Sequence, residues 1–318
     1  MENNIFSSHE ELINTVVSSH FKQLPEKIER MKIGMDNEVY EITVSGSEYI
    51  IRLNIRDSLK GSSKNIPLFK SLDIKVPEIV AEDYSKSLIP YNWQILTRLG
   101  GTDISKVIFN LNNEQLKGIA DELASIIKKL ATLPTNGMYG WFLLSDESLK
   151  PTQMAVAEGM LKTIKNRNEK TGVVKGEYIQ LFAKVLDKYK DYFTSAPSLF
   201  YFDDMSSKNV IIYNGKFNGL VDLDGMAYGD YCESIGRIKA SWYGTSYGSY
   251  YANAVMDNLG LTSTQREIVT MWALLNRIYW LAEAGVQFNQ NSSKEIDHEK
   301  VRASETVIEG LAKELGLN

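Results

Sequence analysis

The residues best suited to chemistry lie around two short β-type runs in the C-terminal half of the sequence. Asp204 and, five positions later, Asn209 precede the run Val210–Tyr213, and Asp222 comes toward the end of the run Gly219–Leu223. The five residues Asn214–Asn218 join the two runs, and we interpret them together as a hairpin. Because a hairpin brings its two ends together, we expect these two aspartates and the asparagine to meet at one mouth.

Two carboxylates and an amide oxygen form a set of hard oxygen ligands that suits Mg²⁺. This ion also keeps several water molecules and phosphate oxygens in its coordination shell. An aspartate that does not bind the ion can accept a proton from a hydroxyl group or orient it for attack. This combination of residues is typical of phosphoryl transfer.

Composition excludes several other classes of protein. The chain has 318 residues, 43% of them hydrophobic, and a net charge of −5, which argues against a nucleic-acid partner. Its one cysteine, Cys232, and three scattered histidines, His9, His20 and His298, argue against disulfides and a zinc cluster. The acidic start and the absence of long apolar runs predict a cytoplasmic protein without a membrane partner.

The elements that must position these residues change in type along the chain. Alternating patterns predict strands over Val39–Val44, Tyr49–Leu53, Ile79–Ala81 and Asn92–Thr97, after a helix over about residues 8–20. A non-helical segment, residues 199–230, interrupts the later helical patterns. Those patterns predict helices from residue 112 to about 130 and over 151–167, 175–193, 231–242, 263–289 and 295–315.

Three segments of the C-terminal half resemble the aminoglycoside phosphotransferase and choline kinase-like family. The segments are Phe202–Asn209, Val221–Asp224 and Gly229–Glu233. In this order they are similar to the family patterns H-G-D-x-x-x-x-N, I-D-[FW]-[DE] and G-D-P-x-x-D. The resemblance implies an α+β fold with the two lobes of a protein kinase. Residues 1–98 would form an antiparallel β lobe that binds nucleotide. Residues 99–318 would form a larger, mainly helical lobe with the catalytic loop, the metal-binding hairpin and the acceptor subdomain.

The resemblance continues upstream and implies a nucleotide site. Gly34–Tyr40 is similar to the family's nucleotide loop, Tyr49–Leu53 to its third strand and Gln94–Gly101 to its hinge. The residues that would bind ATP or GTP are Gly34, Asn37, Ile50, Arg52, Gln94 and Leu96.

By the same resemblance, Asp204 is the catalytic base, Asn209 and Asp222 bind Mg²⁺, and Arg52 holds the phosphates. The implied activity is transfer of the γ-phosphate to a hydroxyl group of a small molecule. An aminoglycoside or similar antibiotic, which would make the protein a resistance enzyme, and a related metabolite are both open as acceptors. The sequence leaves the oligomeric state open.

Three departures from the family pattern are visible. Phe202 stands in place of histidine, and Asp203, in place of glycine, is expected to raise the pKa of Asp204 by like-charge repulsion. In the segment Gly61–Phe69, Pro67 is expected to interrupt the helix that should carry an acidic residue. We therefore expect Arg52 to lack its ion-pair partner. These departures favour, as an alternative, a nucleotide-binding pseudokinase with a regulatory function.

Two weaker alternatives remain. A relative of protein kinases would need room for an activation loop after Asp222, and the sequence leaves little. Gly244–Gly248 matches the G-x-S-x-G motif of serine hydrolases, but a helical pattern precedes it where that motif requires a strand. We interpret this match as accidental. Lys208 is expected to face solvent, and Cys232 to be a small buried residue.

Overall fold

The computed structural model describes residues 8–32, 34, 36–143, 148–288 and 291–317. The contacts divide the chain into two compact units. The first unit contains Met1–Leu99, Val221–Asp224 and Phe288–Asn291. The second contains Gly100–Leu220, Gly225–Gln287 and Ser292–Asn318. Two short segments from the C-terminal half therefore pack with the N-terminal part of the chain.

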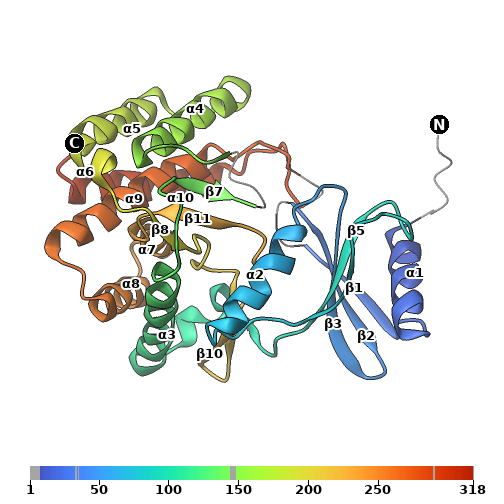
Figure 1. Cartoon of the computed structure of the whole chain (residues 1–318). Coiled ribbons are helices and arrows are strands. Elements are labelled where there is room, and N and C mark those ends of the chain that lie inside the picture. The colour runs from blue at the N-terminus through green and yellow to red at the C-terminus, as the bar shows by residue number, and fades with distance from the viewer. Residues whose placement is uncertain (1–7, 33, 35, 144–147, 289–290, 318) are drawn as a thin grey trace. The chain divides into compact units, whose positions relative to one another are not determined.

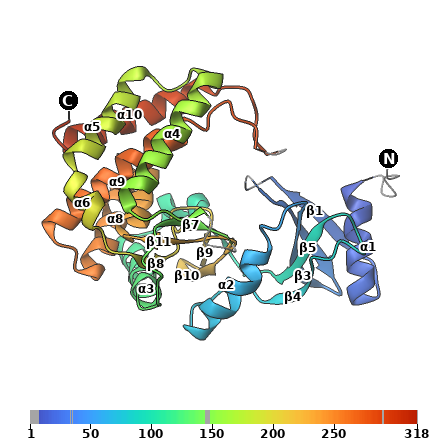
Figure 2. The same ribbon diagram turned by 45° about the horizontal axis from the view of Figure 1, so that its top comes forward.

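The first unit is built on a five-stranded antiparallel sheet with the strand order β1-β2-β3-β5-β4; Figures 1 and 2 together label its strands. Its strands are β1 (Lys27–Met31), β2 (Glu38–Val44), β3 (Ser47–Asn54), β4 (Ile79–Asp83) and β5 (Asn92–Thr97). The four predicted strands are confirmed. Strand β1 was not predicted, because its sequence, KIERM, lacks the alternation of a half-buried strand and none of its residues is fully buried.

The two faces of this sheet serve different purposes. Helix α1 (His9–Phe21), capped by Ser8, lies against one face of the sheet, as Figures 1 and 2 show. Its buried side is apolar. There it meets Ile51 and Leu53 of β3, both fully buried. Because side chains alternate along a strand, Ile50 and Arg52 point to the other face. On that face Arg52 contacts Ser62 of helix α2.

Helix α2 (Lys60–Ser71) runs without interruption through Pro67, so the prediction of a break at this residue is wrong. A proline inside a helix removes one backbone hydrogen bond and strains the preceding turn. Pro67 is exposed, whereas Ile66 and Phe69 on the same helix are buried. Burial of these two apolar side chains, together with the polar contacts described below, offsets the cost of the proline.

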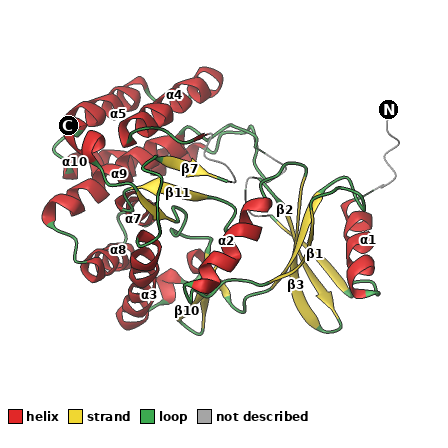
Figure 3. Ribbon diagram, in the orientation of Figure 1, coloured by secondary structure: helices red, strands yellow, loops and turns green. Residues whose placement is uncertain are grey.

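The second unit is mainly helical, as the colours of Figure 3 show. Its α-helices are α3 (Asn113–Ala131), α4 (Gln153–Thr171), α5 (Gly176–Lys188), α6 (Lys190–Ser195), α7 (Cys232–Ser241), α8 (Ser246–Leu259), α9 (Ser263–Leu281) and α10 (His298–Glu314). Helix α8 was not predicted. The helix predicted over 263–289 ends at Leu281, and the turn that follows contains Gly285 in the left-handed region, at φ 77°.

Two small sheets and two 3₁₀ turns complete this unit. The turns are η1 (Ile104–Lys106) and η2 (Ile108–Asn110). One sheet joins β6 (Thr102–Asp103), β9 (Val210–Tyr213) and β10 (Lys216–Leu220). The other joins β7 (Gly140–Phe142), β8 (Leu199–Tyr201) and β11 (Met226–Gly229). Together with the N-terminal sheet, they confirm the predicted α+β class. None of the helices in the described part of the chain is long and apolar enough to cross a bilayer.

The predicted hairpin is present, but its second strand, of the same length as the run Gly219–Leu223, starts and ends three residues earlier. The turn consists of Asn214 and Gly215 alone, both with positive φ (50° and 73°), which is the type I′ geometry. Strand β10 therefore ends at Leu220, opposite Val210. Residues 221–224 are released from this sheet and belong to the first unit.

Candidate active site

Arg52 lies at the centre of a buried polar cluster in the first unit. Its guanidinium forms ion pairs with Asp222, at 2.9 Å from Nη2 to Oδ1, and with Asp224. The arginine side chain is only 6% exposed. Burial alone lowers the pKa of Arg52, but the carboxylates of Asp224 and Asp222 outweigh it and raise that pKa. Helix α2 supplies no acidic residue, as expected, but Arg52 is nevertheless paired, with carboxylates of residues 221–224.

The predicted nucleotide-binding residues of the sheet share one face. The register pairs Arg52 with Gln94 and Ile50 with Leu96, and paired residues of antiparallel strands point to the same side. Gln94 is fully buried, and its Nε2 donates to Tyr84 Oη at 2.8 Å. The sheet thus presents an arginine, an amide and two aliphatic side chains together.

The predicted nucleotide loop is tied to a segment distant in sequence. Gly34 has a φ of 76°, a conformation that favours glycine, and its carbonyl oxygen accepts from Asn291 Nδ2 at 3.1 Å. Asn291 Oδ1 in turn accepts from Arg30 Nη2 at 2.8 Å, and Arg30 pairs with Glu38. Met35 of this loop lies outside the described residues. Sequence reasoning missed Asn291, since no spacing links it to a residue 257 positions earlier.

The predicted catalytic loop, between β8 and β9 of the second unit, brings Asp204 and Asn209 together. Asn209 Nδ2 donates to Asp204 Oδ2 at 2.9 Å and to the Asp204 carbonyl oxygen at 3.1 Å. The Asp204 side chain is half exposed, which suits a group that must reach a substrate. Asp222 belongs to the first unit. The convergence of Asp222 with the other two at one mouth therefore stays a prediction.

The chemistry of these donors fits Mg²⁺. The side-chain hydrogen bonds described for Asn209 use its Nδ2, and the amide oxygen is the atom that a hard cation prefers. Asp222 is half exposed and has a φ of 61°, an unfavourable conformation for aspartate that is found at functional sites. Over the described ranges, no group of three or more His, Cys, Asp and Glu side chains forms a dedicated metal cage. Mg²⁺ needs none when it takes one or two protein ligands together with phosphate oxygens.

A second buried network supports the catalytic loop from α7. Arg237 Nη2 lies 2.9 Å from Asp203 Oδ2, and its Nε donates to Glu233 Oε1 at 2.9 Å. Arg237 Nη1 is 4.0 Å from Asp204 Oδ1, and Tyr201 Oη donates to Glu233 Oε2 at 3.0 Å. Three carboxylates therefore share one guanidinium. Sequence reasoning missed Arg237, although a Glu-x-x-x-Arg pair on a predicted helix was a usable signal.

The shared cation leaves Asp203 partly uncompensated. Burial raises the pKa of Asp203 to about 7, and repulsion by Glu233 and Asp204 adds to the effect, while Arg237 opposes it. Its neighbour Phe202, in place of the family's histidine, is buried in the core. The pKa of Asp203 is thus raised into the neutral range.

This raised pKa predicts a pH-dependent stability. Between about pH 4 and about pH 7 the native state binds more protons than the unfolded chain, because the ordinary pKa of the group is 3.8. The free energy of unfolding should therefore fall as the pH rises through this window. Asp203→Asn cannot titrate and should show a shallower fall. Urea unfolding of both proteins at about pH 5 and about pH 7 measures the difference, and equal slopes would contradict the assignment.

Three further predictions from the sequence concern residues outside these two clusters. Ser246 begins α8 and follows α7 rather than a strand, so the G-x-S-x-G match is accidental, as predicted. Lys208 is exposed and Cys232 is buried, which confirms both predictions; burial raises the pKa of the Cys232 thiol.

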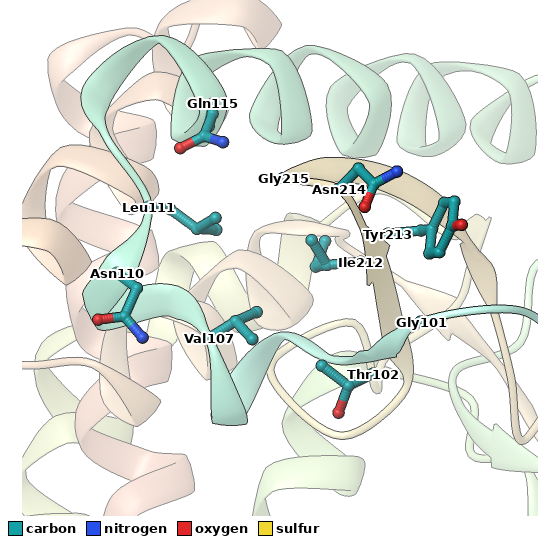
Figure 4. Close-up of a pocket in the computed structure, with 10 residues that line it drawn as sticks. All are labelled: Gly101, Thr102, Val107, Asn110, Leu111, Gln115, Ile212, Tyr213, Asn214 and Gly215. Atoms are coloured by element: carbon teal, nitrogen blue, oxygen red, sulfur yellow. The ribbon is translucent and has the colours of Figure 1, made fainter.

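A cavity of about 350 Å³ opens in the second unit, between the start of α3 and the β9–β10 turn (Figure 4). None of the predicted site residues lines it. Its lining residues are Gly101, Thr102, Val107, Asn110, Leu111, Gln115, Ile212, Tyr213, Asn214 and Gly215.

Comparison with solved structures defines the class of fold. A thermostable mutant of aminoglycoside phosphotransferase APH(4)-Ia matches with a TM-score of 0.69 at 14% identity, over 95% of this chain and 99% of that one. The gentamicin complex of APH(2")-IIa matches with a TM-score of 0.66 at 13% identity, over 95% and 97% of the two chains. A putative fructosamine-3-kinase from Haemophilus somnus gives 0.63 and 13%, over 94% and 96%. These matches confirm the predicted kinase-like fold.

Sequence comparison then gives the family. The sequence model of the Phosphotransferase enzyme family (APH) matches residues 27–264, so the chain belongs to this family. A search among curated proteins finds no match.

Proposed function

We propose that the protein transfers the γ-phosphate of ATP or GTP to a hydroxyl group of a small molecule, with Mg²⁺ as cofactor. The observation that carries this proposal is the ion pair between the buried Arg52 of β3 and the half-exposed Asp222. It joins the residue proposed to hold the phosphates to a residue proposed to hold the metal, in a chain of the Phosphotransferase enzyme family. Structural neighbours have been solved with AMP-PNP and hygromycin B, and with ADP. These complexes support a nucleotide donor and a small acceptor with hydroxyl groups.

In this proposal each cluster has a separate task. Arg52 neutralises charge on the triphosphate, while Gly34, Asn37 and the sheet face with Ile50, Gln94 and Leu96 position the nucleotide. Asn209 and Asp222 hold Mg²⁺, which when bound supplies positive charge opposite the phosphate oxygens.

Asp204 orients the acceptor hydroxyl and takes its proton as the oxygen attacks phosphorus in line. Its contact with Asn209 keeps the carboxylate in place. Catalysis rests on positioning and charge stabilisation.

The acceptor is proposed to be an aminoglycoside-like antibiotic or a related hydroxylated metabolite. Two structural neighbours are complexes with the antibiotics hygromycin B and gentamicin, and a third is a putative fructosamine-3-kinase. These neighbours support both kinds of acceptor. One argument for the pseudokinase alternative was the missing acidic partner of Arg52. This argument is weaker now, because Arg52 has carboxylate partners. Release of nucleoside diphosphate that depends on an acceptor would decide between the two.

The nucleotide site is tested by thermal unfolding with ATP or GTP, each with and without Mg²⁺. A ligand present at about 100 times its Kd should stabilise the wild type by about 2.7 kcal/mol, a shift of several degrees. Asp222→Ala should lose the Mg²⁺-dependent part of this shift, since it lacks a proposed metal ligand. If the wild type shows no shift with either nucleotide, the proposed function is wrong.

A further inference from the structure

Arg52 is bound more completely by Asp224 than by Asp222. Both of its terminal nitrogens donate to Asp224, and Nη1 lies 2.9 Å from Oδ1. Asp222 receives one hydrogen bond from this guanidinium and is 47% exposed, whereas the Asp224 side chain is 10% exposed. The two-point contact has the paired geometry by which arginine holds a carboxylate most firmly. Asp224 is therefore the principal partner of the arginine.

The oxygens of Asp224 are fully engaged by groups of the first unit. Oδ1 accepts from Ser62 Oγ as well as from Arg52, and Oδ2 accepts from Asn37 Nδ2 at 2.8 Å as well as from Arg52. A carboxylate offers about four lone-pair positions, and four donors fill them here. Asp224 therefore has no position left for a cation.

Helix α2 provides this arrangement without any acidic residue of its own. Its sequence, KGSSKNIPLFKS, contains small and amide side chains where it meets residues 221–224. A Cβ on Gly61 would lie 1.7 Å from the Asp224 carbonyl oxygen, so only glycine permits this approach. Asn65 Nδ2 donates to the Leu223 carbonyl oxygen at 2.8 Å. The helix and the segment 221–224 thus form one support for Arg52.

We propose that Asp224 is the positioning residue of Arg52 and replaces the acidic residue that the corresponding helix of kinases supplies. The carboxylate comes from the segment 221–224, and α2 contributes Ser62 and close packing. Asp222 serves the metal, and Asp224 serves the arginine. This inference rests on the proposed function, because it assigns Arg52 to the phosphates of a nucleotide.

The two aspartates should therefore differ in how they affect nucleotide binding. Asp224→Ala leaves Arg52 without its anchor and should weaken binding about tenfold, by a similar factor with and without Mg²⁺. Asp222→Ala should weaken binding only when Mg²⁺ is present. Calorimetric titration of ATP or GTP into wild type and both variants, in Mg²⁺ and in EDTA, measures these factors. Asp224→Asn, which keeps the shape of the side chain, provides a second reading if the alanine variant folds poorly.

A charge relocation sharpens the test. Ser62→Asp in the Asp224→Ala background places a carboxylate on α2, close to Arg52. In the wild type, Nη1 of Arg52 lies 3.0 Å from Ser62 Oγ. This double variant should regain most of the lost affinity. Ser71→Asp in the same background is the matched control, because Ser71 is exposed at the end of the helix. It adds the same charge to α2 and should restore nothing.

The outcomes separate this inference from the proposed function. If the wild type binds nucleotide but Asp224→Ala loses affinity only in Mg²⁺, Asp224 is a metal ligand and the inference is wrong. Equal recovery by Ser62→Asp and Ser71→Asp would also overturn it. If the wild type binds neither nucleotide under either condition, the proposed function fails, and the assignment of Asp224 fails with it.

Discussion

Asp204→Asn is expected to lower the turnover number for phosphate transfer by about 10²–10⁴-fold, the usual contribution of a general base. An amide cannot take the proton of the acceptor hydroxyl, but its oxygen can still accept the hydrogen bond from Asn209 Nδ2. The loop should therefore keep its shape. Nucleotide affinity should be nearly unchanged, because the residues proposed to bind the nucleotide belong to the first unit.

The measurement is acceptor-dependent release of nucleoside diphosphate, beside a calorimetric titration of the nucleotide. Asp187→Asn, an exposed residue of α5, removes the same charge from the surface and should retain wild-type turnover. Equal turnover in Asp204→Asn and the control would show that Asp204 is not the base. A parallel loss of nucleotide affinity would show that its function is structural.

The strands and the spacing of the polar residues could be predicted because their causes are local. Alternating side chains define β2 and β3, and the contact between Asp204 and Asn209 spans only five positions. The main error within the hairpin was also local. The Asn-Gly pair by itself makes the type I′ turn, and this places residues 221–224 outside the strand.

Helix α2 could not be predicted, and the reason is the same packing that supports Arg52. Glycine, serine and proline favour helices poorly, so the segment lacks a helical signal. Gly61 and Ser62 are there because the helix must approach Asp224 closely. Arg52 and Asp224 are 172 positions apart, so no spacing rule could join them. Tertiary contacts, not propensity, determine this part of the site.

The network in the second unit gives the other large expected effect. Arg237→Met should destabilise the protein by about 3–5 kcal/mol, because it removes the only cation described as paired with Asp203 and Glu233. The side chains of these two acids are 10% and 9% exposed, so water cannot replace the guanidinium. Methionine retains much of the side-chain volume, which limits the contribution of a cavity. Urea unfolding measures the loss, and Arg302→Met, at an exposed position of α10, should cost little.

A double-mutant cycle with Asp203→Asn distinguishes charge from packing. If uncompensated carboxylates cause the loss, then at about pH 8, above the pKa of Asp203, Arg237→Met should cost clearly less in the Asp203→Asn background, where one of the acids is neutral. If the arginine acts only by filling space, the cost should be the same in both backgrounds. The cycle also bears on the catalytic loop. Arg237 Nη1 also lies 4.0 Å from Oδ1 of Asp204, the proposed base. If the coupling between Arg237 and Asp203 is electrostatic, the same buried cation stabilises the second unit and contributes to the electrostatic environment of the base.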